Sequence, residues 1–226
     1  MNPITVLLVD DHRFVRDGLL AMLKLEADIE VVGEAKNGRQ AVALARTLCP
    51  AVIVMDIAMP LLNGLEATRQ ILQANPAVRV LILSAHSEDA YIEHAMAMGA
   101  AGYMIKQTAQ HGLAGAIREV CKGRTFLSPS ISNRRCDHQH MAKAVGALPT
   151  KTPDPHFTSR EMEVLQLIAA GKDNKATAHA LKIGIKTVEK HLRRVMETLN
   201  IHDPAGLTRY AITSGIIESS VQVTIL

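Results

Sequence analysis

The sequence predicts an α/β domain with a doubly wound, five-stranded parallel sheet, followed by an all-α domain of four short helices. Two observations support this prediction. Apolar runs alternate with amphipathic helical stretches five times in the first half of the chain, whereas only helical patterns remain after residue 156. The chain has 226 residues, 48% of them hydrophobic, which is enough for two cores. We expect domains at 1–124 and 156–226, joined by a linker at 125–155.

The predicted strands are the apolar runs 4–9, 30–33, 51–55, 78–83 and 101–105. The first, third and fourth are rich in Val, Ile and Leu, as in strands that are buried on both faces. Helical spacing of apolar residues predicts the intervening helices, and on the first of these we expect Phe14 to lie in the core together with Leu19. Regular strand–helix alternation favours a parallel sheet with helices on both faces.

The segment after residue 124 loses this pattern and contains Pro, Ser and charged residues, which is typical of a linker, with a short helix near 141–145. The sequence that follows has a helix start at Thr158 or Ser159, with Glu161 or Glu163 in the first turn, and a helix end at Gly171.

Composition and charge limit the class of protein. No apolar run is long enough to cross a membrane, and the three cysteines lack metal-binding spacing, so we expect a cytoplasmic protein with no membrane partner. Residues 1–124 carry 12 Lys/Arg and 13 Asp/Glu, whereas residues 125–226 carry 13 and 9. The basic second half suggests a nucleic-acid partner.

Polar side chains follow the predicted strands at one edge of the sheet. Asp10 and Asp11 follow the first strand, Asp56 the third, Ser84 the fourth and Lys106 the fifth. Ligands of such sheets bind at the carboxyl ends of the strands. Clustered carboxylates need a cation, oxygen ligands suit Mg²⁺, and a carboxylate beside Mg²⁺ can attack phosphorus. Each residue alone has a simpler interpretation as a turn, cap or solvated charge, but the set predicts an aspartyl-phosphate site.

These motifs, together with the sequence DIAMPLLNG around Asp56, resemble the receiver domain (CheY-like) of response regulators over residues 4–121. The resemblance implies that Asp56 is the phosphoacceptor and that Asp11, Asp56 and the Ala58 carbonyl bind Mg²⁺ with help from Asp10. It also implies that Ser84 and Lys106 bind the phosphoryl group and that Tyr103 is a switch aromatic that rotates inward. For Tyr103, a half-buried strand aromatic is an equally good interpretation.

The sequence KTVEKHLRRVMETL predicts a helix with an apolar face, formed by Val188, Leu192, Val195 and Leu199, and a basic face. A short helix and a tight turn precede it, an arrangement that places a second helix in the major groove of DNA. A solvated basic face on an ordinary helical bundle is the alternative.

Residues 156–217 resemble the LuxR-type helix-turn-helix. The resemblance implies base-edge contacts from Glu189, Lys190 and Arg193, and phosphate contacts from Lys186, Thr187 and Arg194. Three positions depart from the family pattern: Thr177 replaces an Ile, Lys182 a turn Gly, and Gly184 a Ser-type N-cap.

The sequence is therefore similar to response regulators of the NarL/FixJ type, which are not enzymes. The expected partners are a sensor histidine kinase that phosphorylates Asp56, promoter DNA, and a second copy of the chain when the protein is phosphorylated or bound to DNA. Phosphorylation would free the recognition helix. Helix 204–214 carries Leu207, Tyr210 and Ala211, with Ile216 just beyond it, and we expect part of this face to pair two DNA-binding domains. Simple packing against the recognition helix is the alternative.

Two rival functions remain. A phosphatase would need a second acid two residues after Asp56, where Ala58 stands. A DNA-binding protein that does not depend on phosphorylation would have no use for the complete acid set.

Overall fold

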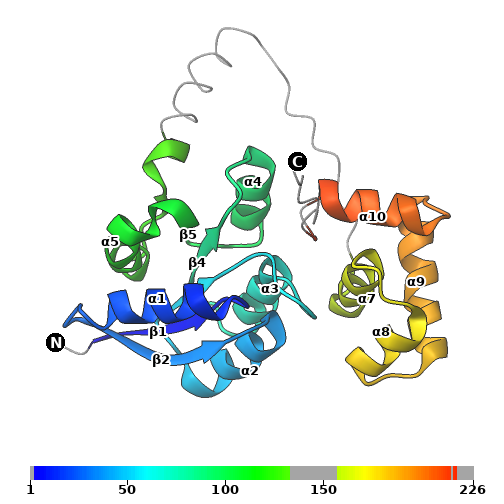
Figure 1. The fold of residues 1–226 in the computed structure, drawn as a ribbon, viewed down its shortest axis with the longest axis horizontal. Helices are drawn as coiled ribbons and strands as arrows, with labels where there is room; N and C mark the ends of the chain where they lie inside the picture. Colours follow the sequence, from blue (N-terminus) through cyan, green and yellow to red (C-terminus); the bar gives the residue numbers. More distant parts are fainter. Residues whose placement is uncertain (1–2, 133–156, 215, 218–226) are drawn as a thin grey trace, which may run out of the picture.

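The computed structural model describes residues 3–132, 157–214, 216 and 217. Within these ranges the chain forms a parallel α/β domain and a separate group of four helices (Figure 1). Both predicted fold classes are confirmed. None of the helices in these ranges is long and apolar enough to cross a membrane.

The sheet has the strand order β2-β1-β3-β4-β5-β6, and every neighbouring pair is parallel. Because the order reverses between β1 and β3, the helices divide between the two faces. The strands are β1 (Ile4–Val9), β2 (Ile29–Ala35), β3 (Val52–Met55), β4 (Arg79–Ser84), β5 (Gly102–Ile105) and β6 (Phe126–Leu127).

Two apolar clusters, one on each face of the sheet, form the core of this domain. On one face, α1 (Arg13–Leu23) and α5 (Ala109–Cys121) bury Leu19, Leu23 and Ile117 against the strands. The other face is covered by α2 (Gly38–Leu48), α3 (Gly64–Ala74) and α4 (Asp89–Ala97). The strands are therefore enclosed on both sides, as their composition predicted.

Phe14 is not part of this core, contrary to expectation, because its side chain is 94% exposed. It lies five residues before Leu19, which is a rotation of about 140° around the helix axis. The buried face of α1 is defined by Leu19 and Leu23, so Phe14 points away from the sheet.

The receiver-like domain extends beyond residue 124. Phe126 and Leu127 add a sixth strand beside β5, residues 129–132 are helical, and Ile131 is buried in the core. Ser128 is also buried, and its Oγ accepts a hydrogen bond of 3.0 Å from the amide of Ile105. Described residues as far as 132 therefore pack with this domain. The short helix predicted near 141–145 lies outside the described residues.

The second domain consists of α7 (Ser159–Ala169), α8 (Asn174–Leu181), α9 (Ile185–Leu199) and α10 (Pro204–Thr213). Thr158 and Glu161 form the capping box at the start of α7, and Gly171, with φ of +82°, follows its end, as predicted. Gly184 caps α9 without a side-chain hydrogen bond. The apolar face predicted for α9 is confirmed, since Val188 and Val195 are fully buried.

Thr177 on α8 is the weak point of the helical domain. Its side chain is completely buried, and Oγ1 has no hydrogen-bond partner among the described residues. A buried hydroxyl without a partner loses its hydration without compensation. The departure from Ile at this position therefore costs stability.

We predict that Thr177→Val stabilises the helical domain, because Val has nearly the same shape and no polar group to desolvate. The expected gain is about 1 kcal/mol, or a rise in Tm of roughly 4–8 °C for a domain of this size. Thermal unfolding of the full chain followed by circular dichroism would measure it. Thr198→Val is the matched control, because Thr198 is exposed; an equal gain in both variants would contradict the assignment to burial.

Candidate functional site

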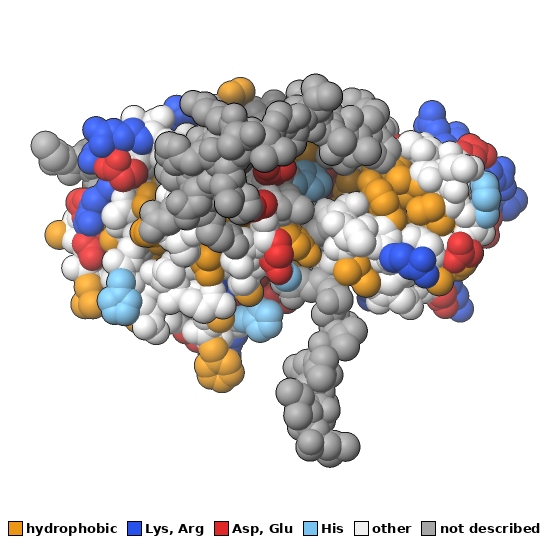
Figure 2. Space-filling model, turned by 90° about the horizontal axis from the view of Figure 1, so that it is seen from above, with side chains coloured by type: hydrophobic (Ala, Val, Ile, Leu, Met, Phe, Trp, Pro, Cys, Tyr) orange, Lys and Arg blue, Asp and Glu red, His pale blue; other side chains and the backbone are white. Residues whose placement is uncertain are grey.

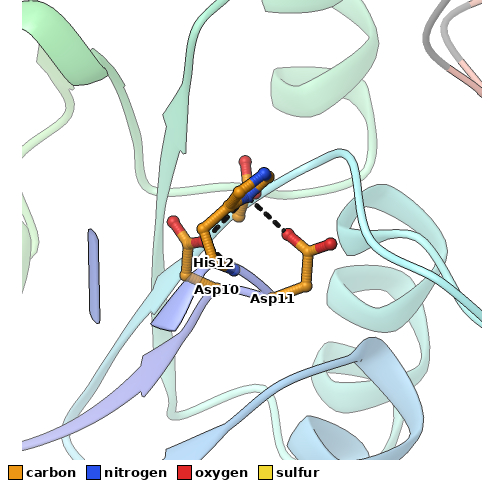
Figure 3. A group of neighbouring side chains, drawn as sticks. Asp10, Asp11 and His12 are labelled. Carbon is orange, nitrogen blue, oxygen red and sulfur yellow. Dashed lines mark hydrogen bonds and ion pairs between the residues drawn. The ribbon is translucent and has the colours of Figure 1, made fainter. Parts of the chain in front are cut away.

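The carboxyl ends of β1 and β3 bring three carboxylates together. Asp10 and Asp11 follow β1, and Asp56 follows β3, whose backbone pairs with β1. Asp10 and Asp56 are buried, whereas Asp11 is partly exposed. One ligand atom from each of these residues and from His12 lies within 4.8 Å of the others (Figure 3). The predicted clustering of the acids is therefore a feature of the structure.

Lys106, which follows β5, reaches two of these acids. Its Nζ lies 2.9 Å from Asp10 Oδ2 and 2.8 Å from Asp56 Oδ2. Asp11 pairs with the exposed imidazole of His12, whose Nδ1 lies 2.8 Å from Asp11 Oδ1. With His12 neutral, three carboxylates face one ammonium group, so the cluster retains two negative charges.

The site perturbs the acid–base properties of its residues. Burial, helped by the charge of Asp10, raises the pKa of Asp56 to about 6, although Lys106 and the Ile57 amide oppose the shift in part. Burial also lowers the pKa of Lys106, but the negative charges of Asp56 and Asp10 outweigh this effect and raise its pKa above the ordinary value. Lys106 is therefore a permanent cation at neutral pH.

The donor set fits a hard divalent cation. Three carboxylates supply oxygen ligands, and two uncompensated negative charges match the charge of Mg²⁺. His12 was not among the predicted site residues. Its position directly after two acids is the only signal in the sequence that could have pointed to it.

Ser84 is the last residue of β4, and Tyr103 is the second residue of the neighbouring strand β5. Ser84 is buried and its Oγ accepts a hydrogen bond of 3.1 Å from the amide of His86. Tyr103 is fully buried rather than half-buried, and its hydroxyl donates to the carbonyl of His86 at 3.0 Å. Burial raises its pKa to about 12, so the hydroxyl keeps its proton. The aromatic ring already points inward in this structure.

The segment between Asp56 and α3, residues 57–63, is called the β3–α3 loop below. Asp56 Oδ1 accepts a hydrogen bond of 2.8 Å from the amide of Ile57 at its start. Gly64 follows the loop, and a Cβ at this position would come within 1.8 Å of the carbonyl oxygen of Asp56. Only glycine therefore allows α3 to begin this close to the acid. Ala58 is half-buried and Pro60 exposed.

The basic face predicted on α9 is exposed. Glu189, Lys190 and Arg193 are exposed on it, as are Lys186, Thr187 and Arg194 toward its flanks. Arg194 also lies 3.5 Å from Glu161 on α7, so it helps to hold the two helices together. Figure 2 shows basic side chains at the end of the molecule that holds α9.

The two domains contact each other mainly through α7, which meets α2, α3 and the β3–α3 loop. Arg39 on α2 pairs with Glu163 on α7 at 2.8 Å, and Arg69 on α3 bonds to Ser159. All six predicted DNA-contacting residues remain exposed in this arrangement. Within the described residues, the receiver domain leaves these six side chains of α9 uncovered.

The dimer face predicted on α10 is largely internal. Leu207, Ala211 and Ile216 are buried in the core of the helical domain, and Tyr210 is half-buried. The alternative interpretation, packing within the domain, holds for these three side chains.

Comparison with known proteins agrees with this arrangement. Residues 6–118 match the response regulator receiver domain, and residues 155–211 match the LuxR family of bacterial regulatory proteins. The transcriptional regulatory protein DegU of Brevibacillus brevis is 33% identical over 96% of both chains. The response regulator protein VraR of Staphylococcus aureus is 34% identical, covering 95% of this chain and 99% of its own.

A structure of two RcsB dimers bound to two parallel DNAs shares the fold, with a TM-score of 0.58 and 24% identity, over 94% of this chain and 99% of that one. The chain belongs to the two-component response regulators, transcriptional regulators in which a receiver domain precedes a LuxR-type DNA-binding domain.

Proposed function

We propose that Asp56 accepts the phosphoryl group and that this modification controls DNA binding by α9. The observation that carries the proposal is the convergence of Asp10, Asp11 and Asp56 with Lys106 at one sheet edge. A receiver domain implies a histidine kinase as phosphodonor, and the helix-turn-helix implies DNA as target.

The chemistry follows from the positions of the side chains. The carboxylate of Asp56 attacks phosphorus, the bond from phosphorus to the donor's histidine nitrogen breaks, and the electron pair leaves with that nitrogen. Lys106 and Ser84 bind the phosphoryl oxygens. Asp11, Asp56 and the Ala58 carbonyl, with Asp10 nearby, would hold Mg²⁺, which would neutralise negative charge as the phosphoryl oxygens approach. Tyr103 changes its contact with the His86 carbonyl when Ser84 moves.

The phosphatase alternative lacks a proton donor. A hydrolase that turns over an aspartyl-phosphate needs an acid beside it to protonate a leaving group. The second residue after Asp56 is Ala58, whose methyl group cannot do so. The site therefore suits a phosphoryl group that stays long enough to act as a signal.

For the DNA complex, we infer that α9 lies in the major groove with Glu189, Lys190 and Arg193 toward base edges. Lys186, Thr187 and Arg194 contact the phosphates. The RcsB structure contains dimers on DNA, and we propose that this chain also binds promoter DNA as a homodimer. The buried residues of α10 exclude a dimer contact built from Leu207 and Ala211.

We predict that acetyl phosphate adds one phosphoryl group to the protein, only in the presence of Mg²⁺, and that Asp56→Asn abolishes the addition. Intact-mass spectrometry would measure it. Asp11→Asn is the companion variant, expected to raise the Mg²⁺ concentration required while the acceptor survives. A full-yield adduct in Asp56→Asn would place the acceptor elsewhere.

The raised pKa of Asp56 predicts a pH dependence. The carboxylate form of Asp56 is the nucleophile. Lowering the pH through about 6 protonates Asp56 and so depletes the nucleophilic form. The initial rate of phosphorylation at low Mg²⁺ should fall about tenfold per pH unit below that value. Saturating Mg²⁺ favours the charged form and should move the inflection to lower pH. A rate that is flat from pH 7 to pH 5 at low Mg²⁺ would contradict the burial argument.

We predict that substitutions on α9 separate base contacts from phosphate contacts. Lys190→Ala and Arg193→Ala should each cost about 1–3 kcal/mol on a specific site and relax its base preference. Lys186→Ala should weaken binding to all sequences alike and lower the salt slope by about one unit. Arg194→Ala is a less clean control because of its ion pair with Glu161. Titrations would use a site selected from genomic DNA and a random duplex, each at several salt concentrations. Equal losses on both duplexes for Lys190→Ala and Arg193→Ala would refute their assignment.

A further inference from the structure

The centre of the contact between the two domains is the β3–α3 loop. Gln166 on α7 is buried, and its side chain bonds to the loop at two points. Its Nε2 donates to the carbonyl of Met59 at 2.8 Å, and its Oε1 accepts from the amide of Asn63 at 2.8 Å. A single side chain of the DNA-binding domain therefore spans most of the loop that follows Asp56.

Leu61 lies at the middle of the same loop and has φ of +71°, in the left-handed region. This conformation is unfavourable for a residue with a branched side chain and persists only where neighbouring groups hold it. The side chain of Leu61 packs against the apolar cluster of Val164, Leu167, Ala178, Leu181 and Val188, all in the DNA-binding domain. The contact across the interface accompanies the strained backbone.

The ends of the loop are tied to the phosphorylation site and to α3. Asp56 Oδ1 accepts a hydrogen bond from the amide of Ile57. Asn63 Oδ1 caps α3 by accepting a hydrogen bond of 2.8 Å from the amide of Glu66. The side-chain amide of Asn63 also donates to the carbonyl of Ile216, in the DNA-binding domain, at 3.0 Å. A displacement of the loop would therefore break contacts with the second domain.

We propose that Gln166 and Leu61 act as positioning residues for the phosphorylation site, by holding the β3–α3 loop in a conformation that opposes phosphorylation. This inference rests on the proposed role of Asp56 as acceptor. Asp56 is only 3% exposed, so a phosphoryl group with roughly two negative charges needs rearrangement of its surroundings. The irregular loop is an adjacent segment that can rearrange, as is the segment that follows Ser84, whereas β3 and β1 are fixed by the sheet.

The coupling acts in both directions. If docking of α7 disfavours the phosphorylated form, phosphorylation must disfavour docking by the same free energy. The recognition helix is exposed in the docked form, so this control does not depend on covering it. Instead, it controls how freely the DNA-binding domain moves relative to the receiver. Two copies of the chain need this freedom to place their DNA-binding domains on two half-sites of the DNA.

Other contacts of the interface do not touch the loop and provide a control. Ser159 bonds to Arg69 on α3, and Glu163 pairs with Arg39 on α2. Removing the Ser159 hydroxyl weakens the interface without loosening residues 57–63. Gln166→Met keeps the length of the side chain and loses both bonds, and Leu61→Gly keeps the left-handed backbone without strain and loses the packing.

The test uses the full-length protein, with acetyl phosphate and Mg²⁺ as probes. The initial rate of Asp56 phosphorylation is followed by intact mass, and amide hydrogen exchange of residues 57–63 is followed by mass spectrometry. We expect Gln166→Met to be phosphorylated roughly five- to tenfold faster than the wild type, which corresponds to the loss of one or two hydrogen bonds, and Leu61→Gly to be accelerated by a similar factor through the loss of its packing. Ser159→Ala should stay within about twofold of the wild type. Exchange of the loop should increase in both loop variants and in the phosphorylated wild type.

Unchanged or slower phosphorylation of Gln166→Met and Leu61→Gly would overturn the proposal, and so would a loop whose exchange does not respond to phosphorylation. An equal acceleration in Ser159→Ala would also overturn it, because docking in general and not the hold on the loop would then be responsible. If no variant and no wild-type protein gains a phosphoryl group on Asp56, the proposed function itself fails. If the wild-type protein is phosphorylated on Asp56 but the variants do not behave as expected, only the inference about Gln166 and Leu61 fails.

Discussion

The ion pairs of Lys106 with Asp10 and Asp56 are the interactions on which the acidic edge of the sheet depends. The buried carboxylates of Asp10 and Asp56 both contact Lys106 and therefore lie close enough to repel each other. Without a counter-charge, burying either of them would cost folding free energy. Lys106 compensates part of that cost and leaves Asp11 without a strong partner. The site is thus stable enough to fold and still negative enough to attract a divalent cation. Both the reactivity of the site and its incomplete neutralisation arise because one lysine faces three carboxylates.

The sequence was sufficient to predict this edge because the topology of a parallel sheet determines where its strands end. In a parallel sheet all strands end at one side, so Asp10, Asp56 and Lys106 had to converge once the apolar runs were taken as strands. The basic helix α9 was predictable for a similar reason, since a 3.6-residue period assigns Val188 and Val195 to the inside and leaves the cations outside. Periodic patterns determine which residues share a face or an edge.

The remaining features have no period and could not be predicted in this way. Leu61 looks like an ordinary apolar residue, and only its backbone angle and its neighbours in another domain reveal its role. Gln166 lies on a helix whose sequence gives no sign that one face meets the receiver. The sixth strand is two residues long and consists of Phe126 and Leu127, too short for alternation to be visible. Phe14 was misplaced because one apolar residue near a helix start does not define a face.

A continuous set of contacts connects the two sites of the protein. It runs from Asp56 through the β3–α3 loop to Gln166, along α7 to Glu161, and from Glu161 to Arg194 on α9. Spatial continuity is not by itself evidence of coupling, because coupling needs an element with two arrangements that both sites bias. The loop meets that requirement better than α7 does. The helix is capped and packed on its apolar side, whereas Leu61 in the loop has a left-handed backbone and packs against the second domain. If undocking releases that backbone, as the proposal for Gln166 and Leu61 requires, control would lie in the segment next to Asp56 and not in the recognition helix.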